Sequence, residues 1–113
     1  MATETLIVLG QVSGTTAIGT YANMYAVPTS TQVAISTIVV CNTASTAATY
    51  RIGIGAASTT LALNEHLVYG ATVPANDSIF LTIGATMTTT AKYLNYSSSA
   101  STVTFAAFGA TVA

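Results

Sequence analysis

The regular return of short strand-like runs is the feature that most restricts how this chain can fold. Runs rich in Val, Ile, Thr, Tyr and Phe recur about every ten residues and are separated by Gly, Asn, Ser, Asp or Pro. We expect strands at residues 5–12, 18–27, 33–42, 48–53, 61–69, 78–83, 92–96 and 103–112. The sequence therefore predicts an all-β fold, a single antiparallel β-sandwich of about eight strands over residues 1–113. Its strand order could be jelly-roll or immunoglobulin-like, because both present short strands joined by polar turns.

Side-chain alternation predicts which residues of two strands face outward. In residues 78–83, Ile79, Leu81 and Ile83 share one face, so Phe80 points to the other face or into an interface. Residues 35–41 (ISTIVVC) are apolar on both faces, as expected of a central strand covered on both sides. Cys41 is accordingly expected to be a small buried hydrophobic residue, with a reactive thiol as the lesser alternative.

The composition limits the kind of partner that the chain can bind. Only 4% of the residues are charged, and Thr, Ala and Ser fill 52 of the 113 positions. A neutral surface is easy to cover with protein, because removing a hydroxyl from water costs far less than removing an ion. The two basic residues and the net charge of −1 argue against nucleic-acid binding. The apolar runs are too short to span a membrane, and we expect neither nucleic acid nor membrane as a partner.

The chain offers very few groups that could carry chemistry. A single histidine, His66, rules out a two-histidine metal site within one chain, and no G-x-S-x-G motif accompanies the serines. His66 and Glu65 are adjacent and would face opposite sides of a strand, so we expect a polar edge or loop there. Asp77 most simply caps a turn. Gly53 and Gly55 are expected to let another backbone come close. We expect no enzyme activity, no metal and no cofactor.

Apolar and aromatic residues are the better candidates for function. Tyrosine offers a large apolar face and one polar tip, which suits protein interfaces and sugar platforms alike. The residues that we predict as interface candidates are Leu6, Ile7, Val8, Leu9, Tyr21, Tyr25, Phe80, Tyr93, Tyr96 and Phe108.

Three stretches carry a family resemblance. The longest stretch begins at Tyr25 and resembles a recurrent pattern in small virion proteins of tailed bacteriophages. Its sequence is YAVPTSTQVAISTIVVCNTASTAATYRIGIG. In that pattern a tyrosine and V-P precede a turn. After the turn come a strand ending in V-C-N, a Ser/Thr/Ala-rich hairpin and a strand of the form Y/F-R-I. VPANDSIFLTIG and VTFAAFGATV resemble its later strands.

The resemblance implies a β-sandwich structural protein of the virion, made in the host cytoplasm and placed on the outer capsid surface. As a decoration or cement protein, the chain would pack across neighbouring major capsid subunits and stabilise the mature shell. Its expected partners are the major capsid protein and copies of itself in a homotrimer. A tail, adaptor or fibre-associated subunit is the alternative, and a carbohydrate-binding or adhesin module that uses the tyrosines is a second. We also expect that residues 1–10, or the strand at 103–112, could act as arms that add a strand to a neighbour.

Overall fold

The computed structural model describes residues 4–112, which form eight β-strands and one short 3-10 helix. The elements are β1 (Glu4–Ser13), β2 (Ala22–Ala26), β3 (Gln32–Asn42), β4 (Ala48–Gly55), η1 (Leu63–Glu65), β5 (His66–Val73), β6 (Ser78–Met87), β7 (Tyr93–Ser98) and β8 (Val103–Val112). The predicted β-sandwich is confirmed, and each expected strand has a counterpart.

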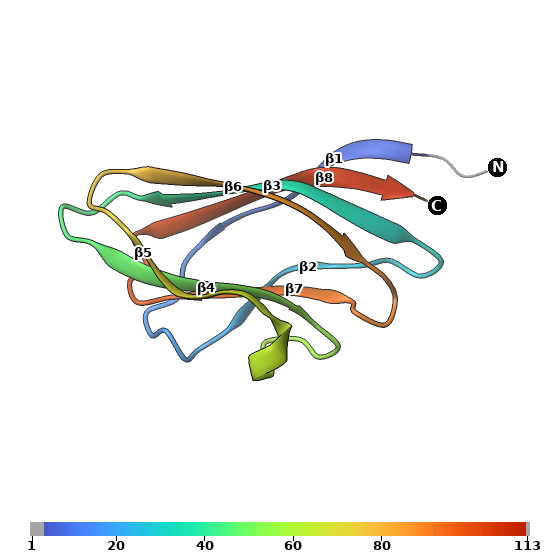
Figure 1. The fold of residues 1–113 in the computed structure, drawn as a ribbon, viewed down its shortest axis with the longest axis horizontal. Coiled ribbons are helices and arrows are strands. Elements are labelled where there is room, and N and C mark those ends of the chain that lie inside the picture. The colour runs from blue at the N-terminus through green and yellow to red at the C-terminus, as the bar shows by residue number, and fades with distance from the viewer. Residues whose placement is uncertain (1–3, 113) are drawn as a thin grey trace.

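The strands form two antiparallel sheets that pack face to face (Figure 1). Sheet A has the order β1-β8-β3-β6, and sheet B has the order β2-β7-β4-β5. The chain crosses between the sheets at almost every connection, and β1 and β2 lie in different sheets. An immunoglobulin-like order would place its first two strands side by side in one sheet, whereas this arrangement of two four-stranded sheets is a jelly roll.

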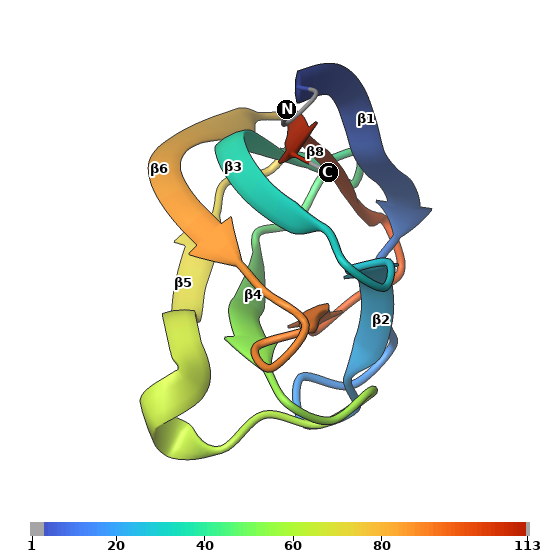
Figure 2. The same cartoon turned by 90° about the vertical axis from the view of Figure 1, so that its right-hand side faces the viewer.

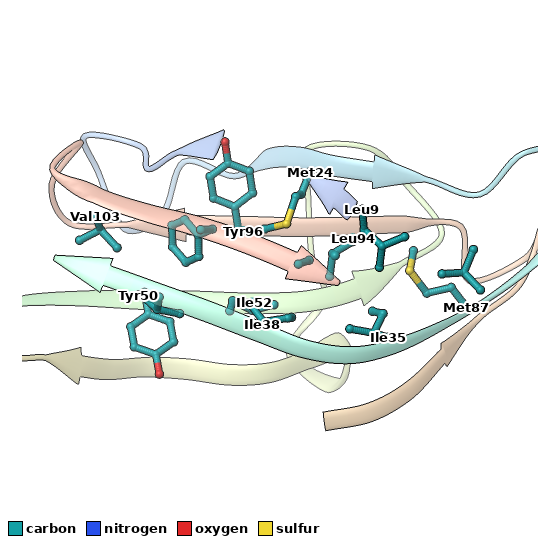
Figure 3. Close-up of a cluster of buried hydrophobic side chains, with 14 of the residues drawn as sticks. Leu9, Met24, Ile35, Ile38, Tyr50, Ile52, Met87, Leu94, Tyr96 and Val103 are labelled. Carbon is teal, nitrogen blue, oxygen red and sulfur yellow. The ribbon is translucent and has the colours of Figure 1, made fainter. Parts of the chain in front are cut away.

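The core lies between the two sheets and is built from alternate residues of the strands (Figure 3). Ile35 and Ile38 of β3 face Ile52 of β4, and all three are buried. The Phe105 ring meets the edge of Tyr50 at a centroid distance of 6.2 Å and lies 4.8 Å from the Tyr96 ring. Leu9 and Tyr96, predicted as interface residues, belong to this core and are 4% and 5% exposed.

Two strands begin later than predicted because loops use their first residues, and β4 to β7 each end two to four residues later than predicted. Residues 18–21 were expected to be in a strand but lie in the β1–β2 loop, where the Ser97 hydroxyl donates a 2.6 Å hydrogen bond to the Ile18 carbonyl. Residues 61–65 were also expected in a strand, yet β5 begins only at His66. The loop that precedes it packs over Gly53, where a Cβ would come within 2.5 Å of the Glu65 carbonyl oxygen. The expectation that Gly53 admits another backbone is confirmed.

Sheet A contains three irregularities at one level. The register shifts between Val8 and Gly10 in β1, and between Ile35 and Thr37 in β3. Beside them, β6 has Gly84 at a φ of 62°, a conformation that glycine adopts without strain. Bulges bend the strand that contains them, so this line marks a bend across sheet A.

Both ends of the described chain lie at one end of sheet A (Figure 1). Glu4 of β1 pairs with Val112 of β8, and the pairing continues without interruption to Val8 and Phe108. The run Leu6 to Leu9, which we expected to serve as an arm, is thus a strand of the chain's own sheet. Residues 1–3 of the expected arm lie outside the described residues.

Candidate functional site

Four rows of side chains run across all four strands on the outer face of sheet A, and a shorter row at one end of the face pairs Glu4, Val112 and Gln32. The strand registers fix these rows, since paired residues point to the same side of a sheet. From β1 through β8 and β3 to β6, the rows are Leu6, Ala110, Ala34 and Thr86; Val8, Phe108, Thr37 and Thr82; Gln11, Ala106, Val39 and Phe80; and Ser13, Thr104, Cys41 and Ser78. None of the positions in these four rows holds a charged residue.

Several large apolar side chains of this face lie in water. Leu6 is 88% exposed, Phe80 70% and Val8 53%, and Phe108 is also exposed. A soluble monomer normally breaks such a surface with charged side chains, and a contiguous apolar patch of this kind is typical of a protein contact. The sequence analysis predicted these four residues as interface candidates, and the structure brings all of them to one face.

A shallow hollow of about 630 Å³ lies on this face beside the line of bulges. Leu6, Val8, Phe108 and Ala110 line its rim, and Ser36 is the one hydroxyl-bearing residue among those that line it. The hollow is therefore almost entirely apolar and open, which suits an apolar side chain of a partner better than a polar ligand.

For β3, the burial predicted from the sequence differs from the burial in the isolated chain. Its apolar residues on both sides predicted a strand covered twice, but in the isolated chain only the inward side is buried. Val39 and Cys41 point outward and are half-buried, so the prediction of a buried Cys41 is wrong for the monomer. Val40 and Asn42 point inward, and strand alternation leaves Cys41 no other side.

Sheet B differs, because loops of the chain itself cover its outer side at β7, whereas Leu67 and Tyr69 of β5 are exposed. Asn95 of β7 is fully buried there. Its amide nitrogen donates hydrogen bonds of 2.9 Å to the carbonyls of Ala57 and Thr60, and its oxygen accepts 3.3 Å bonds from the Thr59 backbone and the Asn23 amide. One side chain thus fixes the β4–β5 loop against the sheet.

A second polar group on the same side joins the β1–β2 loop to the start of β5. The Tyr21 hydroxyl donates to His66 Nε2 at 2.7 Å and accepts from the Arg51 guanidinium at 3.1 Å. The Arg51 guanidinium lies 4.0 Å from the centre of the Tyr69 ring, and the His66 ring meets the edge of Tyr69. The hydrogen bond to Tyr21 raises the pKa of Arg51 above its usual value. Tyr21, His66 and Arg51 on this side of sheet B are therefore hydrogen-bonded within the chain.

The tyrosines do not form the open platform that a sugar-binding module needs. Tyr50 and Tyr96 are buried in the core, and burial raises the pKa of both phenols. Burial also raises the pKa of Tyr25, whose ring packs against the core. Tyr69 is the one tyrosine of the described residues that is exposed, at 56%, and Arg51 packs on one face of its ring.

The remaining predicted interface residues lie away from the outer face of sheet A. Ile7 is half-buried and packs against the core, Tyr21 belongs to the group at Arg51, and Tyr93 is half-buried beside Lys92. Sequence reasoning missed Thr37, Val39 and Ala106, which complete the face at its centre. Alternation along the third and eighth strands is the signal that could have found them.

No cluster of side chains suited to metal binding is found between residues 4 and 112. That part of the chain has no group of three or more His, Cys, Asp or Glu side chains that could hold a metal ion. His66 is engaged with Tyr21, and an Asp77 carboxylate oxygen accepts a 2.8 Å hydrogen bond from the Ser78 backbone. Over the same residues, no helix is long and apolar enough to cross a membrane.

Comparison with solved structures places the fold among known ones, whereas family models and curated proteins gave no match. A structure of infectious bursal disease virus, Gx strain, matches with a TM-score of 0.52 and 10% sequence identity. The match covers 98% of this chain and 31% of the virus chain, so this chain spans about a third of that length. At such low identity the likeness shows a shared fold.

Two further structures match less closely. A crystal structure of the T13 IBDV viral particle has a TM-score of 0.48, and the Gt strain of infectious bursal disease virus has 0.46. Both are 12% identical and cover 98% of this chain, with 30% and 31% of their own chains covered.

Proposed function

We propose that this chain is a structural protein of a bacteriophage particle, a decoration or cement subunit that packs the outer face of sheet A across neighbouring major capsid subunits. The observation that carries the proposal is that the four rows across this face are uncharged and uncovered, whereas loops of the chain itself cover part of the other sheet and leave Leu67 and Tyr69 of β5 exposed. The role is mechanical, and no step of chemistry is required.

The size of the face suits a complete protein interface. Three of its strands are ten residues long and the fourth is eleven. At about 3.3 Å per residue and about 4.8 Å between strands, the sheet presents roughly 600 Å² before side-chain relief is counted. A stable complex covers about 800 Å² of accessible surface on each partner. The face can therefore supply nearly all of one interface.

The chemistry of the face also suits a permanent contact. Covering Leu6, Val8, Phe80 and Phe108 removes apolar surface from water, which is the main favourable term in association. The hydroxyls and methyls between them are easy to cover, since no ion has to lose its water. Contact with several shell subunits at once would hold the joint between them more strongly than any single contact.

The fold and the sequence resemblance support the same role. Jelly rolls are a common architecture of viral capsid proteins, and the structure matched with a TM-score above 0.5 is that of a virus. The stretch from Tyr25 to Gly55 resembles small virion proteins of tailed bacteriophages. Lectins share the jelly-roll architecture, and for that reason the test below includes glycans.

Co-sedimentation with purified particle parts tests the proposal. The protein is mixed separately with mature shells and with tails of its phage, and bound protein is measured against concentration. We expect saturable binding to shells, in many copies per shell, and no binding to tails. Binding to tails alone, in a small symmetric number, would replace the proposal with the tail alternative. Binding to neither, together with binding to a glycan array, would replace it with the carbohydrate-binding alternative.

A further inference from the structure

The first strand presents an unprotected edge. β1 is the outermost strand of sheet A and pairs with β8 on one side only. From Glu4 to Val8 the pairing with β8 is regular, and the first shift comes at Leu9. Over that stretch, alternate backbone N–H and C=O groups point away from β8, with no strand beside them among residues 4–112.

Protein edges are usually protected by charge, proline, short length or a bulge, and both edges of sheet B show such devices. β2 has only five residues and a register shift. β5 has two register shifts and Gly70 at a φ of 74°. Residues 5–8 of β1 contain no charge, no proline and no irregularity. The opposite edge of sheet A, β6, is likewise regular from Ser78 to Thr82, and the two regular stretches directly follow an acidic residue each, Glu4 and Asp77, so it is the exposed side chains that distinguish the two edges.

Exposed apolar side chains gather at the β1 edge more than at the β6 edge. Leu6 and Val8 are both largely exposed, and the apolar hollow lies beside them next to Phe108. On β6, Phe80 is the one large apolar side chain that points outward and is exposed. The end-on view shows β1 at one side of the sandwich and β6 at the other (Figure 2).

We propose that two copies of this chain associate through β1, whose antiparallel pairing across a two-fold axis joins their A sheets into one continuous sheet. Such pairing is self-complementary, because each copy offers the same donors and acceptors to the other. Centred on Leu6, it sets Leu6 opposite its own counterpart and Thr5 opposite Ile7. No like charges meet at the axis, because residues 5–8 carry none.

The symmetry of this pairing keeps the docking face intact. A two-fold axis perpendicular to the sheet leaves the outer faces of both A sheets on the same side. The dimer then presents twice the uncharged surface in one layer, with the two Leu6 and Val8 side chains along the seam. Self-association through β1 does not depend on which part of the particle the outer face of sheet A contacts.

The mass of the protein in solution, measured by sedimentation over a range of concentrations, tests the dimer. We expect the unchanged protein to be a dimer, and Leu6→Lys, which sets two like charges opposite each other at the axis, to weaken dimerisation at least tenfold. Leu63→Lys is the matched control, because Leu63 is 80% exposed on η1 and lies away from sheet A. It should leave the dimer unchanged. A monomeric unchanged protein at all concentrations would overturn the proposal, and so would disruption by Phe80→Lys but not by Leu6→Lys.

Cross-linking tests the register. In a Cys41→Ser background, Leu6→Cys places one thiol at the proposed axis. Residues opposite each other in antiparallel strands have Cα atoms about 4.5 to 5.5 Å apart, which is within the range of a disulfide. Under mild oxidation we expect a covalent dimer from Leu6→Cys and none from Leu63→Cys in the same background. A dimer that does not cross-link at position 6 would refute pairing centred on Leu6.

Discussion

The outer faces of the two sheets differ in what covers them. On sheet B, Asn95, Tyr21 and Arg51 form hydrogen bonds within the chain, and two loops lie over the strands. On sheet A, four rows of uncharged side chains face outward with no loop over them, and Leu6 and Phe80 lie in water. Sheet B is thus covered in part by loops of the chain itself, and the outer face of sheet A is the surface that we propose another protein covers.

The contrast also separates two uses of polar residues. Asn95 is buried and makes four hydrogen bonds, so it stabilises the fold. The threonines of sheet A, such as Thr37 and Thr82, lie among apolar neighbours and keep that face soluble without adding charge. Changes on sheet B should therefore alter stability, while changes on sheet A should alter association.

A charge at the centre of the sheet A face should have the largest effect. Ala106 of β8 lies between Gln11 and Val39 and points outward. Ala106→Lys would bury an unpaired ammonium in the contact, and we expect shell binding to weaken at least about 100-fold, or about 2.7 kcal/mol. Unfolding free energy should change by less than about 0.5 kcal/mol.

The matched control is Ala57→Lys, which places the same charge on the exposed β4–β5 loop above sheet B. Shell binding should be unchanged. Equal losses from the two variants, measured by co-sedimentation, would remove the distinction between the faces.

Loss of the Asn95 side chain should have the largest effect on stability. Asn95→Ala leaves the carbonyls of Ala57 and Thr60 and the Thr59 amide without their partner. We expect the unfolding free energy to fall by about 2 to 4 kcal/mol, measured by denaturant unfolding. Thr82→Ala on the exposed side of β6 should change it by less than about 0.5 kcal/mol. A stable Asn95→Ala protein would show that the loop is held by other contacts.

The close packing of the β4–β5 loop over Gly53 should give a smaller loss. A Cβ in Gly53→Ala would meet the Glu65 carbonyl oxygen at 2.5 Å, so the loop has to move. We expect a cost of about 1 to 3 kcal/mol in unfolding free energy. Gly19→Ala is the control, because a Cβ there meets nothing within 4 Å. If both changes prove neutral in thermal unfolding, the loop does not depend on this approach.

The hydroxyl that joins Arg51 and His66 should contribute least. Tyr21→Phe removes both hydrogen bonds of this partly buried group, and we expect a loss of about 1 kcal/mol. Tyr69→Phe keeps the ring that Arg51 covers and should change stability by less than about 0.3 kcal/mol. Greater destabilisation by Tyr69→Phe than by Tyr21→Phe would contradict the assignment of the network to Tyr21.

The fold was predictable because alternation and turn residues act locally. The runs around Ile38, Ile52 and Phe105 carry the inward positions of their strands, and Pro28 and Pro74 fall just outside strands as their missing N–H requires. The jelly-roll order was not predictable, because it depends on which strands pair across long sequence distances. Residues 18–21 have a strand-like sequence, but they lie in the β1–β2 loop, where the Ile18 carbonyl accepts a hydrogen bond from Ser97 of β7.

The site was predictable in part. Alternation placed Phe80 outward. Leu6, Val8 and Phe108 were chosen as apolar or aromatic residues, and the structure shows that all three are exposed. Leu9 is the same residue type as Leu6, and only the tertiary packing places Leu9 and Tyr96 in the core. No local sequence pattern predicts that Asn95 holds a loop over sheet B, because the carbonyls that its amide binds lie more than thirty positions away in the sequence. For the same reason, the sequence does not predict that the outer face of sheet A stays uncovered.

The single cysteine offers the most direct measurement of the central claim. Cys41 lies on the outer face of sheet A, half-buried, between Thr104 and Ser78. A thiol reagent is applied to the free protein and to the protein assembled on shells, and labelled Cys41 is quantified by mass spectrometry. We predict ready labelling of the free protein and strong protection on the shell, while Leu63→Cys in a Cys41→Ser background stays reactive in both. Equal labelling of Cys41 in the free and the assembled protein would contradict the account, because the face would then remain open in the particle.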